Sequence, residues 1–297
     1  MLKHAYLIMV HNNFGLLKKQ LELLDDEKND FYIHVDEKAG SFDKNILVQN
    51  IKKSNTIFIS RRKVFWGDYT LTQTEIDLIK AALSKGNYSY LHLLSGQDLP
   101  IKSKKYIFDF FACSDKIYLC CGSTTGSYQE IRTRYYYPFI KTQIFRKSKI
   151  VKGLSRVLGR LQFLLLINRH KKTGNYNICY HGWQWFSIPK DFAEYVVSQE
   201  AHIYSTFHHT LASDESFLQT VAMNSDFKHR IFKFDCLEES VMRRIDWKRG
   251  RPYTFTSEDY HYIMNSPYLF ARKFDESKDG KIIEMIFEEV SCQNKHS

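Results

Sequence analysis

Short apolar runs and helical stretches alternate along the first hundred residues of the chain. Apolar runs typical of buried strands occupy residues 5–10, 31–35, 56–60 and 88–94, and most contain β-branched or aromatic residues. Leucines recur at helical spacing in LLKKQLELL, between the first two runs, and TLTQTEIDLIKAAL forms a second helical pattern between the last two. Strands that alternate with helices predict an α/β fold with a mainly parallel central sheet.

A polar cluster follows each of the four predicted strands. The clusters are His11-Asn12-Asn13, Asp36-Glu37-Lys38, Arg61-Arg62-Lys63 and Ser95-Gly96-Gln97-Asp98. Because ligands of parallel α/β sheets bind at the carboxyl ends of the strands, these clusters predict one shared ligand-binding edge.

The third cluster leads through Val64, Phe65 and Trp66 into the second helical pattern. That helix can start anywhere from Gly67 to Thr72, and Thr72 with Glu75 fits a capping box. We expect the cations to raise the local potential for an anionic ligand and the rings to seal the helix onto the sheet. A direct phosphate contact from Arg62 is not expected.

Length and composition narrow the class of protein. The chain has 297 residues without an internal repeat or a low-complexity linker, so we expect one domain over residues 1–297. A formal net charge of +10 predicts an anionic partner, such as a nucleotide, a nucleic acid or an acidic membrane surface. The six cysteines include no C-x-x-C pair, and the sequence has neither a secretory signal nor an apolar run of about 18 residues. These features predict a soluble or peripheral intracellular protein.

The middle of the chain is strongly basic. Residues 131–190 contain thirteen Lys and Arg and no Asp or Glu. A helix is predicted over residues 149–165, with Lys149, Lys152, Arg156 and Arg160 outside an apolar face made by Ile150, Leu154, Val157, Leu158, Leu161 and Leu165. Such a helix can lie on an anionic membrane. Amphipathic helices of compact domains usually bury the apolar face, and burial is the outcome we expect.

Seven segments, taken in order, resemble one known family. They are AYLIMVHNN, YIHVDEK, VFWGDYTLTQTEIDLIKAAL, YLHLLSGQDLPIKS, HGWQWFSIPKDFAEYVV, SDESFLQT and LFARKFD. Over residues 4–275 the chain resembles the core-2/I-branching N-acetylglucosaminyltransferases and peptide xylosyltransferases of glycosyltransferase family 14, with the weakest match in residues 140–175. The resemblance implies a Rossmann-like GT-A fold, with residues 1–110 as the nucleotide-binding half and residues 111–290 as the acceptor and catalytic half.

The resemblance also implies an inverting transfer from a UDP-sugar donor, with no metal and no other cofactor. Such a transfer needs a base for the acceptor hydroxyl and positive charge beside the departing diphosphate. The chain contains no D-x-D motif, with which many such enzymes bind a divalent ion. The positive charge is therefore expected from the cationic segments WKRGRPYTF and FARKF.

Glu215 in SDESF matches the catalytic carboxylate of the family. Ser213 or Asp214 is expected to cap a helix with Glu215 in its first turn, where the helix dipole favours an ionised base. Spacing alone favours an ordinary first-turn glutamate that only stabilises the helix, because such glutamates are common.

Donor contacts follow from the same resemblance. Asp36 matches the residue that pairs with the uracil edge, and Val10 and His11 close the neighbouring strand. Asp98 matches a position near the donor. Both aspartates are also typical turn residues at strand ends.

Two cations are expected at the diphosphate. Lys273 in FARKFD matches the family lysine that contacts it. Arg251 is the better candidate for the family arginine, with Arg249 as the alternative. A lone Lys or Arg in a basic protein is otherwise a solvated surface charge.

The acceptor side is expected to combine aromatic rings with charged groups. Trp183 and Trp247 are candidates for stacking on a sugar, and Trp247 matches an acceptor-side aromatic of the branching enzymes. Trp185 is more typical of a core. Glu130 and Arg132, or Arg134, lie where the branching enzymes contact the acceptor.

The resemblance, taken together with the charge and the absence of a signal, implies a cytoplasmic, bacterial-type glycosyltransferase that moves GlcNAc from a UDP-sugar to a glycan, or to a lipid-linked glycan, in surface polysaccharide synthesis. Peripheral contact with an anionic membrane would follow if the basic helix binds lipid. One alternative is a xylosyltransferase on the same scaffold. Another is a basic, non-catalytic nucleic-acid-binding protein, although the chain has no recognised nucleic-acid-binding motif and nucleic acid is not an expected partner.

Overall fold

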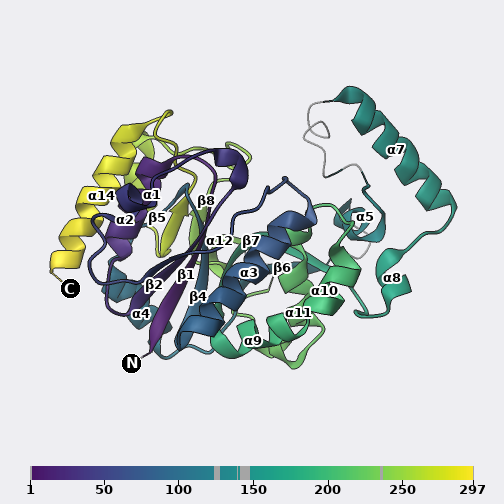
Figure 1. Ribbon diagram of the computed structural model, residues 1–297, viewed down its shortest axis with the longest axis horizontal. Helices are drawn as coiled ribbons and strands as arrows, with labels where there is room; N and C mark the ends of the chain where they lie inside the picture. The colour runs from purple at the N-terminus through teal and green to yellow at the C-terminus, as the bar shows by residue number, and fades with distance from the viewer. Residues whose placement is uncertain (1, 124–127, 139, 141–147, 235–236, 297) are drawn as a thin grey trace.

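A six-stranded sheet forms the centre of the protein, with helices on both of its faces (Figure 1). The computed structural model describes residues 2–123, 128–138, 140, 148–234 and 237–296. The strand order is β3-β2-β1-β4-β7-β6, and a separate small sheet has the order β5-β9-β8. The bounds of the central strands are β1 Lys3–Val10, β2 Asn29–Val35, β3 Thr56–Phe58, β4 Tyr88–Ser95, β6 Tyr118–Ser123 and β7 Tyr180–Pro189. Those of the small sheet are β5 Asp98–Pro100, β8 Arg243–Ile245 and β9 Phe270–Arg272.

The four predicted strands are confirmed and pair in parallel, β2 with β3, β1 with β2 and β1 with β4. β3 ends at Phe58, two residues earlier than predicted. β7 runs antiparallel to both β4 and β6, so the sheet is mostly parallel but not wholly so. The predicted α/β class is therefore confirmed.

Alternation along the strands decides which helices cover each face. Ala5 and Leu7 of β1 pack into a core with α3, α9, α10 and α11, whereas Tyr6 and Ile8 pack into a second core with α1, α2 and α4. A third core joins α1 to the small sheet, α13 and α14. The helices are α1 Phe14–Leu24, α2 Lys44–Val48, α3 Tyr69–Lys85, α4 Lys104–Ala112, α5 Tyr128–Arg134, α7 Lys149–Leu164, α8 Arg169–Thr173, α9 Lys190–Ser198, α10 Glu200–Phe207, α11 Phe217–Met223, α12 Leu237–Ser240, α13 Tyr260–Met264 and α14 Gly280–Lys295.

The start of α3 lies within the predicted interval, but the predicted capping box is wrong. Asp68 is the N-cap residue, and its carboxylate accepts a hydrogen bond from the Thr70 N–H at 3.0 Å. Thr72 instead shares a 2.8 Å hydrogen bond with the Ser213 hydroxyl, and Glu75 is buried against Gln184. Tertiary partners therefore occupy the two side chains that resemble a local cap.

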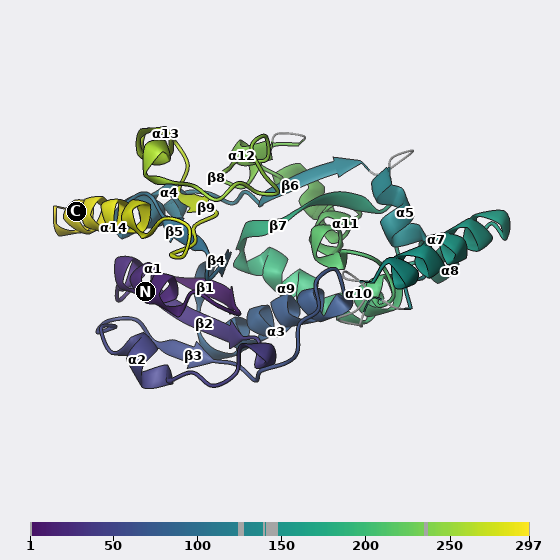
Figure 2. The same ribbon diagram turned by 90° about the horizontal axis from the view of Figure 1, so that it is seen from above.

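The prediction that the basic helix buries its apolar face is also wrong. Five of the six predicted apolar side chains are 49–77% exposed, and the sixth, Leu158, is half-buried. The five are Ile150, Leu154, Val157 and Leu161 of α7 and Leu165 directly after it. The side of the helix that contacts the rest of the protein carries Gln162, whose side chain hydrogen-bonds both the N–H and the carbonyl of Tyr136. As Figures 1 and 2 show, α7 lies at the end of the molecule opposite α14. Within the described residues, no helix has the length and apolar character needed to cross a bilayer.

Candidate active site

A pocket of about 500 Å³ opens at the carboxyl ends of the parallel strands. It forms at the edge where the polar clusters were predicted to meet. Its lining includes residues that follow β1, β2, β4 and β9, together with Trp66 before α3 and part of β7. Its lining residues include Val10, His11, Asp36, Lys38, Trp66, Gln184, Trp185, Pro252, Arg272 and Lys273.

Asp36 joins the ends of the first two strands beside this pocket. Its N–H donates to the Val10 carbonyl at 2.8 Å. Its carboxylate accepts from the Lys38 N–H at 2.9 Å and lies 3.6 Å from Lys38 Nζ. Asp36 is thus both a turn residue and a lining residue, and the two interpretations of the sequence are compatible.

The lining has a positive character. Burial lowers the pKa of His11, Asp36 opposes that change, and Lys273 and Lys38 reinforce it. His11 is therefore neutral at pH 7, and the positive charge near it comes from the two lysines. A neutral imidazole beside cations suits a nucleotide site, because the phosphates meet the full charges while the base meets an uncharged surface.

Asp98 lies behind the pocket and not in its lining. Its side chain is 1% exposed, and its carboxylate accepts from the Ser95 N–H at 2.7 Å. It also lies 3.4 Å from Nη1 of Arg272 and 3.8 Å from Nη1 of Arg243. Burial lowers the pKa of both arginines, that of Arg243 to about 9, and Asp98 opposes the change.

Asp98 is therefore connected to the pocket through Arg272, and its predicted role near the donor stays a prediction. That arginine lines the pocket, and its guanidinium carbon lies 3.7 Å from the centre of the Trp185 ring. Sequence reasoning missed Arg272, although it stands beside Lys273 in a segment already recognised as cationic.

The two arginines considered for the diphosphate differ in their surroundings. Arg249 is bound to two carboxylates, at 2.5 Å from Asp246 and 2.8 Å from Asp259. Arg251 is exposed and directly precedes Pro252, a lining residue. Of the two, only Arg251 stands beside the pocket, and its contact with a diphosphate stays a prediction.

The arginines before α3 fix the ends of the strands. Arg61 donates to the carbonyls of Val35 and Asp36 at 3.1 and 2.8 Å. Arg62 forms an ion pair with Asp77 of α3. Both guanidinium groups are thus bound to protein groups, and the cluster supports the pocket mainly by fixing the loop that carries Trp66.

Glu215 lies in a 3-10 turn, Ser213–Glu215, directly before α11, and not in the first turn of an α-helix as predicted. The turn follows Ala212, whose φ of 54° is left-handed, and Ser216 is the N-cap of α11. The Ala212 N–H donates to the Gly67 carbonyl at 2.7 Å. Since Gly67 follows the lining residue Trp66, this bond ties the glutamate turn to the rim of the pocket.

The Glu215 carboxylate combines access with one strong positive neighbour. Its side chain is 32% exposed, and Oε2 lies 2.7 Å from Arg132 Nη1 of α5 and 3.9 Å from His181 Nε2. Burial raises the pKa of Glu215 and Arg132 opposes that change, which reverses the direction expected from a helix dipole. Burial and Arg132 lower the pKa of His181 to about 4, so that imidazole is neutral at pH 7.

Two buried carboxyl groups behind Glu215 were not foreseen. Burial and the charge of Glu215 raise the pKa of Asp214 to about 8. Glu75 accepts from Gln184 Nε2 at 2.8 Å, and burial together with Asp214 raises its pKa well above the usual value. Burial thus favours the protonated form of both groups, and a pKa of about 8 keeps Asp214 mostly protonated at pH 7, which limits charge repulsion on Glu215. No periodicity in the sequence distinguishes Glu75 from other helical glutamates.

The predicted acceptor residues fall into separate pairs. Trp183 and Trp247 pack together, with ring centres 5.5 Å apart. Trp183 follows His181 by two residues on β7, next to a break in the β6–β7 register. Arg132 contacts Glu215, whereas Glu130 lies 3.7 Å from Arg134 on the same helix. Trp185 is buried, as expected for a core residue.

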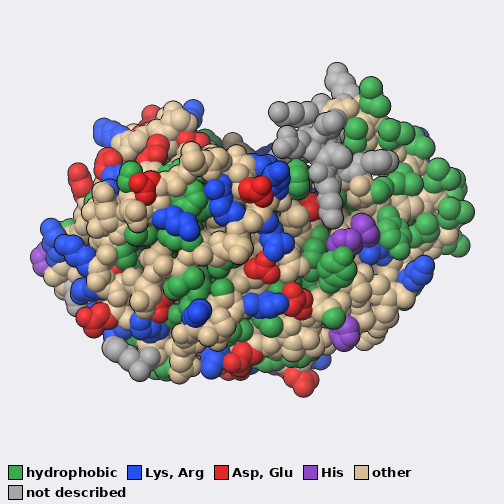
Figure 3. Space-filling view, in the orientation of Figure 1, with side chains coloured by type: hydrophobic (Ala, Val, Ile, Leu, Met, Phe, Trp, Pro, Cys, Tyr) green, Lys and Arg blue, Asp and Glu red, His purple; other side chains and the backbone are tan. Residues whose placement is uncertain are grey.

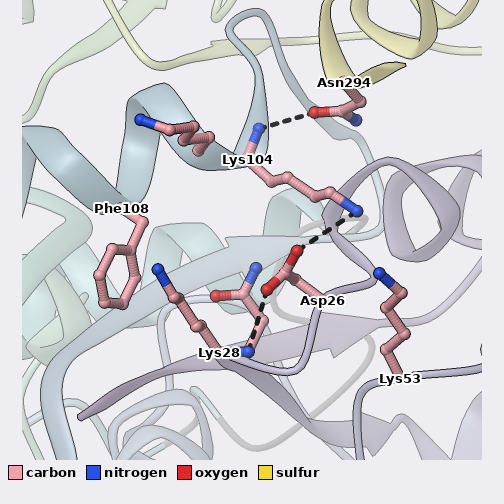
Figure 4. A pocket seen from close by; sticks show the side chains of 8 residues that line it. Asp26, Lys28, Lys53, Lys104, Phe108 and Asn294 are labelled. Atoms are coloured by element: carbon pink, nitrogen blue, oxygen red, sulfur yellow. Dashed lines mark hydrogen bonds and ion pairs between the residues drawn. The ribbon is translucent and has the colours of Figure 1, made fainter. Parts of the chain in front are cut away.

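A second pocket, of about 400 Å³, lies at the opposite end of the sheet beside the start of β2 (Figure 4). Lysines dominate its lining, but several are bound to protein groups. Lys104 lies 3.4 Å from Asp26, and Lys28 lies 4.4 Å from the centre of the Phe108 ring. No predicted site residue lines this pocket.

Comparison with known proteins places these features in context. A family model described as core-2/I-branching enzyme matches residues 4–265. Xylosyltransferase 2 of Canis lupus familiaris is 23% identical over 304 residues, which cover 95% of this chain and 33% of that protein. The probable beta-1,3-galactosyl-O-glycosyl-glycoprotein beta-1,6-N-acetylglucosaminyltransferase 7 of Homo sapiens is 24% identical over 305 residues, which cover 94% of this chain and 66% of that protein.

The chain thus spans about a third of the xylosyltransferase and just under two thirds of the acetylglucosaminyltransferase. Among solved structures, the 4-diphosphocytidyl-2C-methyl-D-erythritol synthase of Anaerococcus prevotii matches 80% of this chain and 89% of its own, with a TM-score of 0.36 and 8% identity. That likeness is too distant to bear on function.

Proposed function

The chain belongs to the core-2/I-branching enzyme family of glycosyltransferases, and we propose that it transfers a sugar from a UDP-sugar to a glycan hydroxyl, with inversion and without a metal ion. One observation carries this proposal. A partly exposed carboxylate, Glu215, is tied by the Ala212–Gly67 hydrogen bond to the rim of a pocket lined by cations.

The donor would enter the pocket at the ends of β1 and β2. Asp36 offers a carboxylate to the N–H of the uracil edge, beside Val10 and the neutral His11. Lys273, Lys38 and Arg272 offer positive charge to the diphosphate, and Arg251 stands next to the lining. Cations that already face the pocket stabilise a leaving diphosphate without reorganising during the reaction.

In the proposed step, the ionised Glu215 takes the proton of the acceptor hydroxyl. The hydroxyl oxygen forms a bond to the anomeric carbon of the donor sugar from the face opposite the diphosphate. The bond from that carbon to the phosphate oxygen breaks, and UDP leaves with its electron pair. The products are the inverted glycoside, UDP and protonated Glu215.

The acceptor would lie between α5 and the tryptophan pair. Trp183, two residues after His181 on β7, and Trp247 form an aromatic pair, and sugar rings stack on such surfaces. Arg132 holds Glu215 in place, and Glu130 stands two residues away on α5. We propose a glycan or lipid-linked glycan acceptor in surface polysaccharide synthesis, at the cytoplasmic side of the membrane.

GlcNAc is the first candidate for the donor sugar. Xylose is the second, because proteins named xylosyltransferase 2 and an N-acetylglucosaminyltransferase match the chain at nearly the same identity, 23% and 24%. The preference between the two sugars can be measured directly by comparing the release of UDP from the two donors.

The test is release of UDP by the purified protein from UDP-GlcNAc, UDP-Xyl, UDP-GalNAc and UDP-Glc, with and without EDTA. We expect UDP-GlcNAc to be hydrolysed fastest, at a rate that EDTA leaves largely intact. Preference for UDP-Xyl would replace the donor with the second candidate. A strict requirement for Mn²⁺ would contradict the role given to Lys273 and its neighbours, and failure to bind or cleave any of the four donors would contradict the proposed function.

A further inference from the structure

Helix α7 carries a large exposed apolar surface. Ile150, Leu154 and Val157 are 77%, 53% and 55% exposed, and Leu161 is 49% exposed. The surface continues past the end of the helix, where Leu164, Leu165 and Leu166 are 67–77% exposed. Figure 3 shows these hydrophobic side chains gathered along the outer edge of the molecule. Contiguous apolar surface of this kind marks an interaction site in a folded protein.

We propose that α7 is an interfacial helix that binds the surface of an anionic phospholipid membrane. Its spacing fits that role, since Ile150, Leu154, Val157 and Leu161 recur at intervals of three and four residues on one face. Arg160 is exposed and stands three residues after Val157 and four before Leu164, so it borders the apolar face. A helix lying in the headgroup region needs this combination of an apolar face and a cationic flank.

Charge complementarity selects an anionic surface over a second copy of the chain. Residues 131–190 contain thirteen Lys and Arg and no Asp or Glu. A twofold contact through α7 would bring the same cations of two copies together, with no carboxylate from this region to pair with them. Anionic lipid headgroups supply the missing negative charge.

The attachment of α7 suits a contact with a defined orientation. The Gln162 side chain accepts a hydrogen bond from the Tyr136 N–H and donates one to the Tyr136 carbonyl. Arg134 Nε donates to the Ile167 carbonyl at 3.3 Å. Arg134 ends α5, the helix that carries Arg132 beside Glu215. If the proposed function holds, a bound membrane would lie on the acceptor side of the active site, where a lipid-linked glycan would arrive.

The experiment is co-sedimentation of the full chain with phosphatidylcholine vesicles that contain or lack phosphatidylglycerol, at low and high salt. We expect binding only to the phosphatidylglycerol vesicles, with release at high salt because screening weakens charge attraction. Leu161→Ser combined with Leu165→Ser should weaken binding at least tenfold, and Arg160→Gln about fivefold, as expected for one cation at an anionic surface.

Matched controls use exposed residues far from α7. Ile46→Ser on α2 tests loss of an exposed apolar side chain, and Lys281→Gln on α14 tests loss of an exposed charge. Neither control should change vesicle binding, and all variants should keep the melting temperature and UDP affinity of the wild type. UDP affinity also distinguishes membrane binding from the proposed function. A protein that binds UDP but not vesicles would contradict only membrane binding, and one that binds vesicles but not UDP would contradict only the proposed function.

Four results would overturn the proposal. One is failure of anionic vesicles to retain the wild type at low salt, and another is equally strong binding to vesicles without phosphatidylglycerol. Binding that the α7 variants do not weaken would place the contact elsewhere. Light scattering that shows a dimer abolished by the Leu161 and Leu165 substitutions would identify a second copy as the occupant.

Discussion

Replacing Glu215 with Gln should abolish sugar transfer while leaving the fold and UDP binding intact. Gln keeps the size and hydrogen-bonding capacity of the side chain but cannot take up the acceptor proton. Loss of a general base costs roughly 10²–10⁴-fold in rate, or about 2.7–5.4 kcal/mol in activation free energy. The neighbouring His181 cannot substitute efficiently, because its pKa of about 4 makes it a weak base.

The effect of this substitution on stability should be small, because two contributions oppose each other. The ion pair with Arg132 is lost, but its side chains are 24% and 32% exposed, and such pairs contribute about 0–1 kcal/mol. The folded-state pKa of Glu215 is raised, so its contribution to stability is complete below the unfolded pKa and declines as pH rises through the folded pKa. At pH 7 the ionised group therefore destabilises the fold slightly, and Gln removes that cost.

The assay compares transfer rate, UDP affinity and melting temperature for wild type, Glu215→Gln and the control Glu284→Gln. Glu284 also forms an ion pair, at 2.9 Å from Lys19, but it lies on α14 far from the pocket. The control should behave as the wild type in all three measurements. A Glu215→Gln protein with near-normal transfer, or one whose lost activity is matched by lost folding, would refute the assignment.

Three further predictions concern the pocket and its buried charges. Lys273→Ala should weaken UDP binding tenfold or more in calorimetry and leave uridine binding unchanged, since a hydrogen bond to a charged group contributes about 1.5–3 kcal/mol. The control Lys278→Ala replaces an exposed lysine nearby and should change neither affinity. Asp98→Asn should lower the free energy of unfolding in urea by about 3–5 kcal/mol, because two buried arginines lose their counter-charge. The control Asp109→Asn removes an exposed ion pair and should lower the free energy of unfolding by less than about 1 kcal/mol. Equal losses for the two variants would argue against the buried pairing of Asp98. Because the pKa of Asp214 is raised to about 8, the stability of the fold should fall as pH rises from about 4 to 8. Asp214→Asn should flatten that decline. The same dependence of melting temperature on pH for wild type and variant would contradict this prediction.

The sheet and the edge that holds the pocket were predictable from local patterns. The strands of residues 5–10, 31–35 and 88–94 are buried on both faces, so each appears as an apolar run of strand length. The polar residues after them lie at one edge because the strands are parallel. Topology alone therefore brings His11 and Asp36 to the same pocket.

The features that were not predictable depend on contacts between distant segments. Asp98 looks like any turn aspartate, and only the packing of β5 against β9 buries it beside Arg272. Glu215 was expected in a helix, but the left-handed Ala212 starts a separate 3-10 turn. The apolar face of α7 resembles a buried face in sequence, and its exposure follows from the attachment of the opposite, polar side through Gln162.

A crystal structure of the protein with UDP tests the central claim most directly. The account predicts UDP in the pocket at the ends of β1 and β2, with the uracil edge at the Asp36 carboxylate and the diphosphate beside Lys273 and Arg272. UDP bound at the other end of the sheet, among Lys28, Lys53 and Lys104, would contradict it. So would UDP in the predicted pocket with its diphosphate turned away from Lys273.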